Sequence, residues 1–168
     1  DIIKNCTFAE PQKEVEYSQK AFSLLKIASD IQPKFSRIWL FMGGFTNVLG
    51  AREENKETKN KLLLEARSYL DRAITLSPKR QEFFIEMEKN YMLAEDYQGM
   101  EKLAVDCIKI DPNIGECYWY LGIAQIFMGD QKTGKENIEL SKAKNYNDPH
   151  YLQLGVAYIS QKNYKDAS

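Results

Sequence analysis

The amino-acid sequence predicts an all-α protein, a right-handed superhelical solenoid of antiparallel helix pairs. Apolar residues recur at the spacing of an α-helix, with no strand-like alternation of apolar and polar residues. Prolines 33, 78, 112 and 149 follow one another at spacings of 45, 34 and 37 residues. A short motif, an aromatic residue followed three positions later by Leu-Gly, occurs after two of these prolines. Repetition at a period of about 20 to 50 residues is typical of stacked helical units.

A helix is predicted before each of the first three prolines. These helices end alike, with an apolar and then a polar residue directly before the proline. A small residue lies five positions before each proline: Ala28, Ala73 and Cys107. Because proline cannot donate the hydrogen bond that would continue the helix, it ends one helix and begins the turn to the next.

A second helix is predicted after each proline, over residues 35–50, 83–94, 118–128 and 151–161. Two of these helices carry the motif, as Tyr118…Leu121-Gly122 and Tyr151…Leu154-Gly155, and Trp39…Met42-Gly43 is a close variant. The glycine lets two helices approach closely, and the aromatic and leucine side chains fill the space beside it. Since a helix pair of this size cannot bury its apolar face alone, neighbouring pairs must stack.

The first proline spacing exceeds the 34-residue spacing by 11 residues (45 against 34), about three helical turns. The extra run, residues 51–61, has no apolar face. It either lengthens both helices of one pair or forms a charged loop. Glu57 and Lys61, four residues apart, favour the longer helices, although Glu53 and Glu57 form a like-charged pair at the same spacing.

The composition is that of a globular domain, with 43% hydrophobic and 28% charged residues. The formal net charge of −1 predicts no broad attraction to nucleic acid or to an anionic membrane, so we expect a protein or peptide partner. The longest apolar stretch, residues 38–51, is too short and too polar to span a bilayer. Because the chain opens on Asp1 and stops at Ser168 inside a helical pattern, we expect a soluble piece of a longer protein, whose compartment the sequence leaves open.

No residue pattern predicts catalysis, a metal site or a cofactor. The lone histidine, His150, has no neighbouring ligands with which to build a zinc site. The three cysteines, Cys6, Cys107 and Cys117, are an odd number without a CxxC pair, so we expect buried reduced thiols and no disulfide framework. Residues 129–135 fit the phosphate-loop pattern G-x4-G-K, but Glu136 follows where Ser or Thr is needed, and a helix precedes the loop in place of a strand. The sequence therefore predicts a protein that is not an enzyme.

From Val15 to its end the chain resembles tetratricopeptide repeats (TPR). Residues 81–114 have the 34-residue length of that repeat, and the unit that begins at Gly115 carries the clearest motif. Two residues depart from the pattern, since Glu88 stands where the repeat favours glycine and Met100 where it favours alanine. The resemblance implies one repeat domain over residues 1–168, with units near 12–33, 35–78, 81–112 and 115–147 and a shortened unit at 148–168.

The resemblance also implies where a partner binds, because the first helix of each pair lines the concave side of such a solenoid. The predicted partner-binding residues are Leu40, Phe41, Ile85, Lys89, Trp119, Tyr120, Ile123, Phe127 and Gln153, with Gly44, Glu86, Leu93, Leu152 and Val156 beside them. Residues 117–128 are apolar nearly all round, so Trp119 and Tyr120 are either packed against neighbouring helices or line a groove for an apolar peptide or helix. Binding of an acidic C-terminal tail is disfavoured, because Arg37 and Lys89 are the only basic residues, and Asn47 the only asparagine, predicted to line the groove.

A second, looser resemblance rests on residues 76–83 and 115–122, which are similar to the repeat tails of bacterial O-antigen ligase or polymerase-like membrane proteins. It implies a soluble appendage on a cell-envelope glycan enzyme whose catalytic part lies in a membrane segment outside this sequence. The expected function is a non-catalytic scaffold that holds a peptide or protein in its concave groove. The alternative is a structural or self-assembling repeat element whose apolar surface is covered by another copy or by further repeats.

Overall fold

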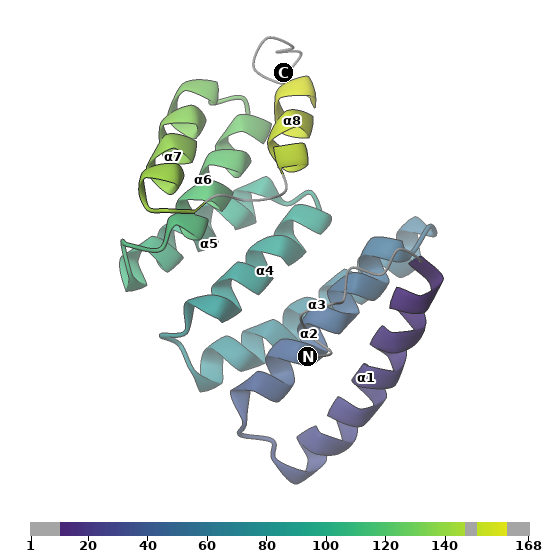
Figure 1. The fold of residues 1–168 in the computed structure, drawn as a ribbon. Helices are drawn as coiled ribbons and strands as arrows, with labels where there is room; N and C mark the ends of the chain where they lie inside the picture. Colours follow the sequence, from purple (N-terminus) through teal and green to yellow (C-terminus); the bar gives the residue numbers. More distant parts are fainter. Residues whose placement is uncertain (1–10, 147–150, 161–168) are drawn as a thin grey trace. The chain divides into compact units, whose positions relative to one another are not determined.

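A computed structural model describes residues 11–146 and 151–160, and the side chains of residues 151–153 lie outside this description. Within these ranges the chain forms eight helices and no strand (Figure 1), which confirms the predicted all-α fold. None of the described helices is both long and apolar enough to cross a bilayer. The chain divides into two compact units, Asp1–Ala94 and Glu95–Ser168, and each is described by itself. Cys6 and His150 lie outside the described residues.

Unit 1 contains helices α1 (Pro11–Ile31), α2 (Ser36–Arg52), α3 (Lys56–Leu76) and α4 (Gln81–Leu93). Helix α2 packs against the other three helices of this unit (Figure 1). The closest contact joins α2 and α3, where a β-carbon added to Gly43 would lie 2.5 Å from the side chain of Leu70. Small and apolar side chains of α3 line this contact and are buried: Leu63, Ala66, Leu70 and Ala73. The small residue before Pro78 is therefore part of the core of the pair.

The charged run at residues 51–61 is mostly helical, so the expectation of longer helices is confirmed. Helix α2 ends at Arg52 and α3 begins at Lys56, giving helices of 17 and 21 residues against 13 each for the later pair α6 and α7. Asn55 ends the short turn, because its side chain accepts a hydrogen bond from the Thr58 amide at 3.0 Å. The expected pair of Glu57 and Lys61 forms at 2.7 Å on an exposed surface.

An aromatic cluster joins α3 to its neighbours in unit 1. The ring of Tyr69 lies 6.2 Å from the ring of Trp39 on α2 and 5.7 Å from the ring of Phe22 on α1. Burial raises the pKa of Tyr69 to about 12, with a further contribution from its hydrogen bond to the carboxylate of Glu65. Trp39 thus contacts the second helix of its own pair, as expected for the aromatic residue of the motif.

Unit 2 contains helices α5 (Tyr97–Ile110), α6 (Gly115–Phe127), α7 (Gln131–Ala143) and α8 (Tyr151–Ser160). Helix α6 contacts α5, α7 and α8. The structure therefore buries most of α6, including three residues that the sequence analysis named as partner-binding: Trp119 is 1% exposed, Tyr120 4% and Ile123 0%. Helices α5, α7 and α8 pack on several sides of α6, so the apolar residues around α6 belong to the core of unit 2. Trp119, Tyr120 and Ile123 therefore do not line an open groove.

The glycine-rich segment that resembles a phosphate loop forms the turn between α6 and α7. Gly129 has φ 94°, a conformation that glycine adopts readily. The Asp130 side chain then accepts a hydrogen bond from the Thr133 amide at 3.2 Å and caps α7. Gly134 lies inside α7, so this segment is a helix–turn–helix connection.

Two glycines bring α6 and α7 into close contact. A β-carbon on Gly122 would lie 2.7 Å from the main-chain oxygen of Gly134, and one on Gly134 would lie 2.8 Å from the main-chain oxygen of Gly122. Ile126 and Ile138 fill the space beside them: the Ile126 side chain would lie 2.6 Å from a β-carbon on Gly134, and that of Ile138 2.9 Å from one on Gly122. Gly122, the glycine of the motif, is therefore needed because any larger residue there would push α6 and α7 apart.

We expect Gly122→Ala to lower the free energy of unfolding of unit 2 by about 1–3 kcal/mol, because the added methyl group meets a main-chain oxygen that can move only if the helices separate. Urea unfolding followed by circular dichroism measures the change. The matched control is Gly44→Ala in α2, where the nearest atom to the new β-carbon is a Glu86 side-chain oxygen at 3.5 Å. That change should leave stability unaltered or raise it by up to about 1 kcal/mol. Equal losses in both variants would contradict the close contact of α6 and α7.

Cys107 and Cys117 form a disulfide, which corrects the expectation of reduced thiols. Cys107 occupies the small-residue position near the end of α5, facing the helix that follows. After the turn at Pro112, α6 runs back past that position, so the Cα atoms of the two cysteines are 5.9 Å apart. Both side chains are 0% exposed. Counting and spacing the cysteines could not detect the pair, because the antiparallel packing of α5 and α6 brings the two residues together.

Candidate functional site

Helices α2 and α4 contact each other in unit 1, and each is the first helix of a predicted pair (Figure 1). We give the name α2–α4 face to six exposed or half-buried residues at helical spacing on these two helices: Leu40, Phe41, Gly44, Ile85, Glu86 and Lys89. Phe41 exposes 40% of its surface, and the other five residues are half-buried. The four partner-binding residues that were predicted on α2 and α4, Leu40, Phe41, Ile85 and Lys89, are thus exposed or half-buried, and partner binding there stays a prediction.

Glu86 lies at the centre of the α2–α4 face. Its Oε1 atom is 3.5 Å from the position that a β-carbon at Gly44 would take. The amide of Asn47 donates a hydrogen bond to the same oxygen at 3.2 Å, and the ammonium group of Lys89 donates one to Oε2 at 3.1 Å. A carboxylate offers about four acceptor positions. Glu86 is therefore a positioned acceptor with capacity for a further donor.

A buried chain of polar side chains supports this carboxylate from inside unit 1. Asn90 donates to the side-chain oxygen of Asn47 at 2.7 Å and to the main-chain oxygen of Leu63 at 2.9 Å. Arg67 of α3 donates to the side-chain oxygen of Asn90 at 3.0 Å. Asn47 is 3% exposed and Asn90 0%. Buried polar groups that satisfy one another hold their rotamers, so the chain fixes the direction in which Asn47 presents its amide to Glu86.

Asn90 and Arg67 are not among the residues predicted from the sequence. These residues lie 43 and 23 positions from the partners they contact, Asn47 and Asn90 respectively. The sequence offered one indication, an asparagine within a helix whose inward positions are otherwise mostly apolar. Polar residues at such positions usually carry a hydrogen bond to another element, but the sequence does not say to which.

The α2–α4 face is poorly suited to bind a C-terminal carboxylate, because its cations and its asparagine already have partners. Lys89 is already paired with Glu86 at 3.1 Å, and Arg37 lies 3.6 Å from Glu82. Asn47 uses its amide and its oxygen inside the polar chain. An incoming carboxylate would meet the negative charge of Glu86, and like charges at short range repel.

The remaining predicted residues are not part of this face. Phe127 is half-buried at the end of α6, where its ring stacks on Tyr97 of the same unit at 4.2 Å. Burial raises the pKa of Tyr97, and the nearby Glu95 carboxylate adds to the shift. The side chain of Gln153 lies outside the described residues. Partner binding at Phe127 and Gln153 stays a prediction.

The comparisons with known proteins concern the fold. No family model matches the sequence, and no curated protein is similar to it. Among solved structures, the crystal structure of a thermophilic TPR protein from Thermus thermophilus superposes with a TM-score of 0.66 and covers 92% of this chain and 82% of that one. The fold is TPR-like. At 16% sequence identity, the TPR-like fold is all that this similarity establishes. The looser resemblance to O-antigen ligase-like proteins has no counterpart among these findings, and the bacterial cell-envelope origin stays a prediction.

Proposed function

We propose that this chain is a non-catalytic scaffold that binds a peptide or protein segment through the α2–α4 face. The observation that carries the proposal is an exposed aromatic side chain, Phe41, about one helical turn along α2 from Gly44, which adjoins the Glu86 carboxylate that is positioned from inside the unit. Aromatic anchors in a binding surface contribute a large share of the affinity of protein interfaces. A preorganised acceptor adds affinity, because the protein loses little conformational entropy when the ligand binds.

The chemistry of the face favours one kind of ligand. Phe41 with Leu40 and Ile85 offers apolar contact area, while Glu86 offers a charged acceptor. A segment with an apolar residue and a nearby lysine, arginine or main-chain N–H donor satisfies both. Nucleic acid is disfavoured, since phosphates need several cations and Lys89 is the only cation on the face.

A peptide-display selection on the 168-residue chain tests the proposal, followed by fluorescence polarisation with the selected peptides. We expect Phe41→Ala to weaken binding by about tenfold or more, because truncating a central aromatic anchor removes most of its apolar contact. Glu86→Gln should weaken peptides that carry Lys or Arg more than analogues that carry Gln at that position, because it removes the charge and keeps the shape.

The matched control is Leu64→Ala, a change on α3 at a leucine that is 64% exposed and outside the face. It should leave the affinities unchanged. Circular dichroism of each variant shows whether the helices are intact. If peptides bind the Phe41→Ala and wild-type chains equally well, the α2–α4 face is not the binding surface. If no peptide is selected at all, the scaffold function itself is in doubt.

A further inference from the structure

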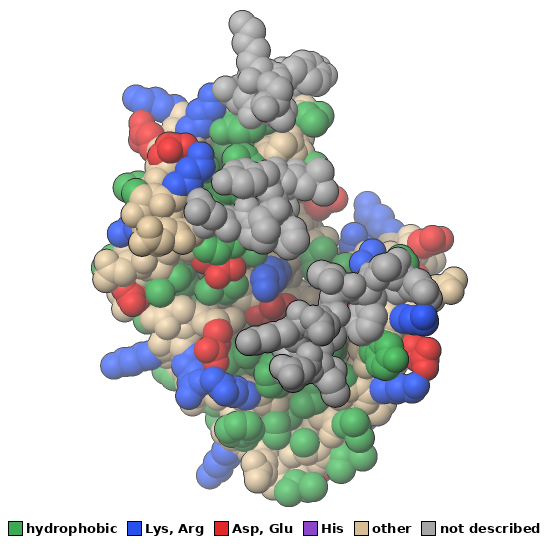
Figure 2. Space-filling model, viewed as in Figure 1, with side chains coloured by type: hydrophobic (Ala, Val, Ile, Leu, Met, Phe, Trp, Pro, Cys, Tyr) green, Lys and Arg blue, Asp and Glu red, His purple; other side chains and the backbone are tan. Residues whose placement is uncertain are grey.

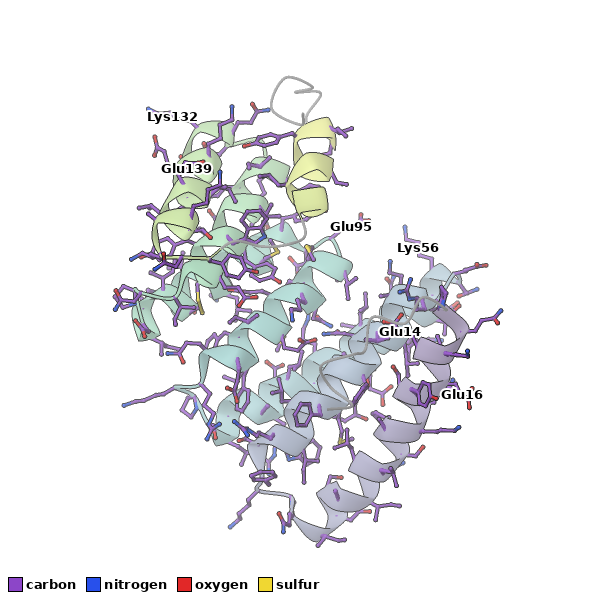
Figure 3. The ribbon with its side chains drawn as sticks, in the orientation of Figure 1. Glu14, Glu16, Lys56, Glu95, Lys132 and Glu139 are labelled. Carbon is purple, nitrogen blue, oxygen red and sulfur yellow. A yellow bond between two sulfur atoms is a disulfide. The ribbon has the colours of Figure 1, made fainter. Side chains whose placement is uncertain are left out.

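A relay of side-chain hydrogen bonds crosses unit 1 in one direction. The guanidinium group of Arg67 on α3 donates to the side-chain oxygen of Asn90 on α4 at 3.0 Å. Asn90 donates in turn to Asn47 on α2 at 2.7 Å, and Asn47 donates to the Glu86 carboxylate at 3.2 Å. Side chains of these three helices fill the space between them (Figure 3). We call the four residues the donor relay, because each donates a hydrogen bond to the next.

The groups at the two ends of the donor relay determine its direction. A guanidinium group can only donate hydrogen bonds, and an ionised carboxylate can only accept them. The side-chain oxygen and nitrogen of an asparagine are distinguished by the partners that surround them. Two main-chain oxygens, which are acceptors as well, lie beside the amide nitrogens: that of Leu63 at 2.9 Å from Asn90 and that of Glu86 at 3.4 Å from Asn47. Asn47 therefore presents its amide donor, and not its oxygen, to Glu86.

Only the last residue of the donor relay belongs to the α2–α4 face. Asn90 is fully buried and Asn47 is 3% exposed, whereas the Glu86 side chain is 21% exposed. Arg67 is half-buried, and its guanidinium carbon lies 4.0 Å from the centre of the Tyr91 ring. Asn90 thus reaches a ligand at this face only through Asn47 and Glu86.

We propose that Asn90 is a positioning residue, which holds Glu86 through Asn47 and thereby makes the α2–α4 face selective for a basic side chain of the ligand. This role rests on the proposed function of that face. Because Asn90 fixes Asn47, the Asn47 amide holds one oxygen of Glu86 before any ligand binds. The other oxygen accepts from Lys89, whose side chain is 44% exposed, and exposed ion pairs contribute little, so a lysine or arginine of the ligand can displace it. Hydrogen bonds between ionised groups are about twice as strong as neutral ones, which favours a basic side chain over a glutamine.

Selection of a basic ligand depends on the local contact with Glu86. Acidic and basic side chains lie next to one another on the visible surface of the molecule (Figure 2), and the formal net charge is −1. Opposite charges side by side cancel at a distance, and salt screens what remains beyond about 10 Å at 0.1 M ionic strength. The position of the Glu86 carboxylate therefore decides how strongly the face prefers a basic side chain.

A double-mutant cycle in the ligand-free chain tests the role of Asn90. Asn90→Asp keeps the acceptor for Arg67 but removes the donor to Asn47, so Asn47 should turn its amide toward the new carboxylate. The oxygen of Asn47 then faces Glu86, where Glu86→Gln supplies a donor. We expect Glu86→Gln to destabilise the wild-type chain and to stabilise the Asn90→Asp chain. The two effects on the unfolding equilibrium constant in urea should differ by at least about tenfold.

Two controls separate the donor relay from other effects. Glu86 and Asn90 are four residues apart on α4, so two carboxylates at these positions also repel each other directly. The same cycle in an Asn47→Leu chain removes the relay and keeps the repulsion, and the difference should fall to about twofold or less. The matched control is Thr46→Val, at a buried residue of α2 whose hydroxyl donates to the main-chain oxygen of Met42 at 2.8 Å, and there Glu86→Gln should act as in the wild type. Equal effects of Glu86→Gln in the wild-type and Asn90→Asp chains overturn the proposal, and so does a difference that persists with Asn47→Leu.

If the Asn90→Asp chain does not fold, hydrogen exchange of the Asn47 side-chain amide, measured by NMR, decides. Arg67→Met removes the first donor of the relay at a half-buried position. Arg67 enters the relay at Asn90, so its loss affects Asn47 by way of Asn90. We expect exchange in the Arg67→Met chain to be at least about threefold faster than in the wild type, because hydrogen bonds in a chain strengthen one another. Equal exchange rates in the two chains overturn the proposal.

Peptides from the display selection distinguish the role of Asn90 from the proposed function. The preference for a lysine peptide over its glutamine analogue, as a ratio of affinities, should be at least about fivefold larger in the wild type than in the Asn90→Asp chain. An equal ratio in the two chains contradicts the selectivity. If no peptide binds while the cycle shows the coupling, the proposed function fails and Asn90 still positions Glu86. If peptides bind through Phe41 and the cycle shows no coupling, the proposed function stands and Asn90 has no positioning role.

Discussion

Trp119→Ala is expected to lower the free energy of unfolding of unit 2 by about 3–5 kcal/mol, the largest effect of any single substitution considered for this chain. Trp119 is 1% exposed within α6, and its ring lies 6.0 Å from that of Tyr146. Its replacement leaves a cavity that the surrounding helices can fill only in part, so both the apolar contact and the packing are lost. Urea unfolding followed by circular dichroism measures the loss. Phe41→Ala, at a residue that is 40% exposed, should cost far less.

The chain contains two tryptophans, so Trp39→Phe leaves Trp119 as the only indole fluorophore. In that background we expect weak quenching of Trp119 by iodide, because a charged quencher reaches only exposed rings. Strong quenching together with a small change in stability would place Trp119 on an open surface. It would then return to the set of binding residues, and the core of unit 2 would need another description.

Loss of the disulfide is expected to lower the free energy of unfolding by about 3 kcal/mol. The two cysteines are 10 residues apart in sequence. A cross-link that closes a loop of this size restricts the unfolded chain by about that amount in the loop-entropy model. Urea unfolding of the wild type with and without a reducing agent measures the effect. A double variant, Cys107→Ala with Cys117→Ala, should unfold identically under both conditions.

Thiol titration of the unfolded, unreduced chain provides an independent check. The sequence contains three cysteines, so a single titrating thiol is expected if Cys107 and Cys117 are bonded. Three titrating thiols would contradict the disulfide. Because both sulfur atoms lie in fully buried residues, reduction of the folded chain should be slow compared with reduction in urea.

The helices and their order could be predicted from the sequence. The prolines at 33, 78 and 112 lie in the turns that follow α1, α3 and α5, and the charged run at 51–61 proved to be mostly helix. Phe41, Ile85 and Lys89 lie on α2 and α4 and are exposed or half-buried, and partner binding there stays a prediction. Trp119, Tyr120 and Ile123 were predicted by the same argument and are buried. The first helices of the pairs differ in their surroundings, because α6 is packed by α5, α7 and α8.

Helix period, proline turns and the close approach at Leu-Gly are local properties, since they depend on residues a few positions apart in the chain. These properties alone were enough to predict the all-α fold of helix pairs. Contacts between distant residues required the packed helices. Asn90 meets Asn47 across 43 positions, Glu86 receives its amide donor from another helix, and Cys107 reaches Cys117 around a turn. Whether a side chain is buried, hydrogen-bonded or joined in a disulfide depends on which other side chains lie next to it in the folded chain. Many arrangements of the same helices are compatible with one pattern of apolar residues, so the pattern alone does not determine these contacts.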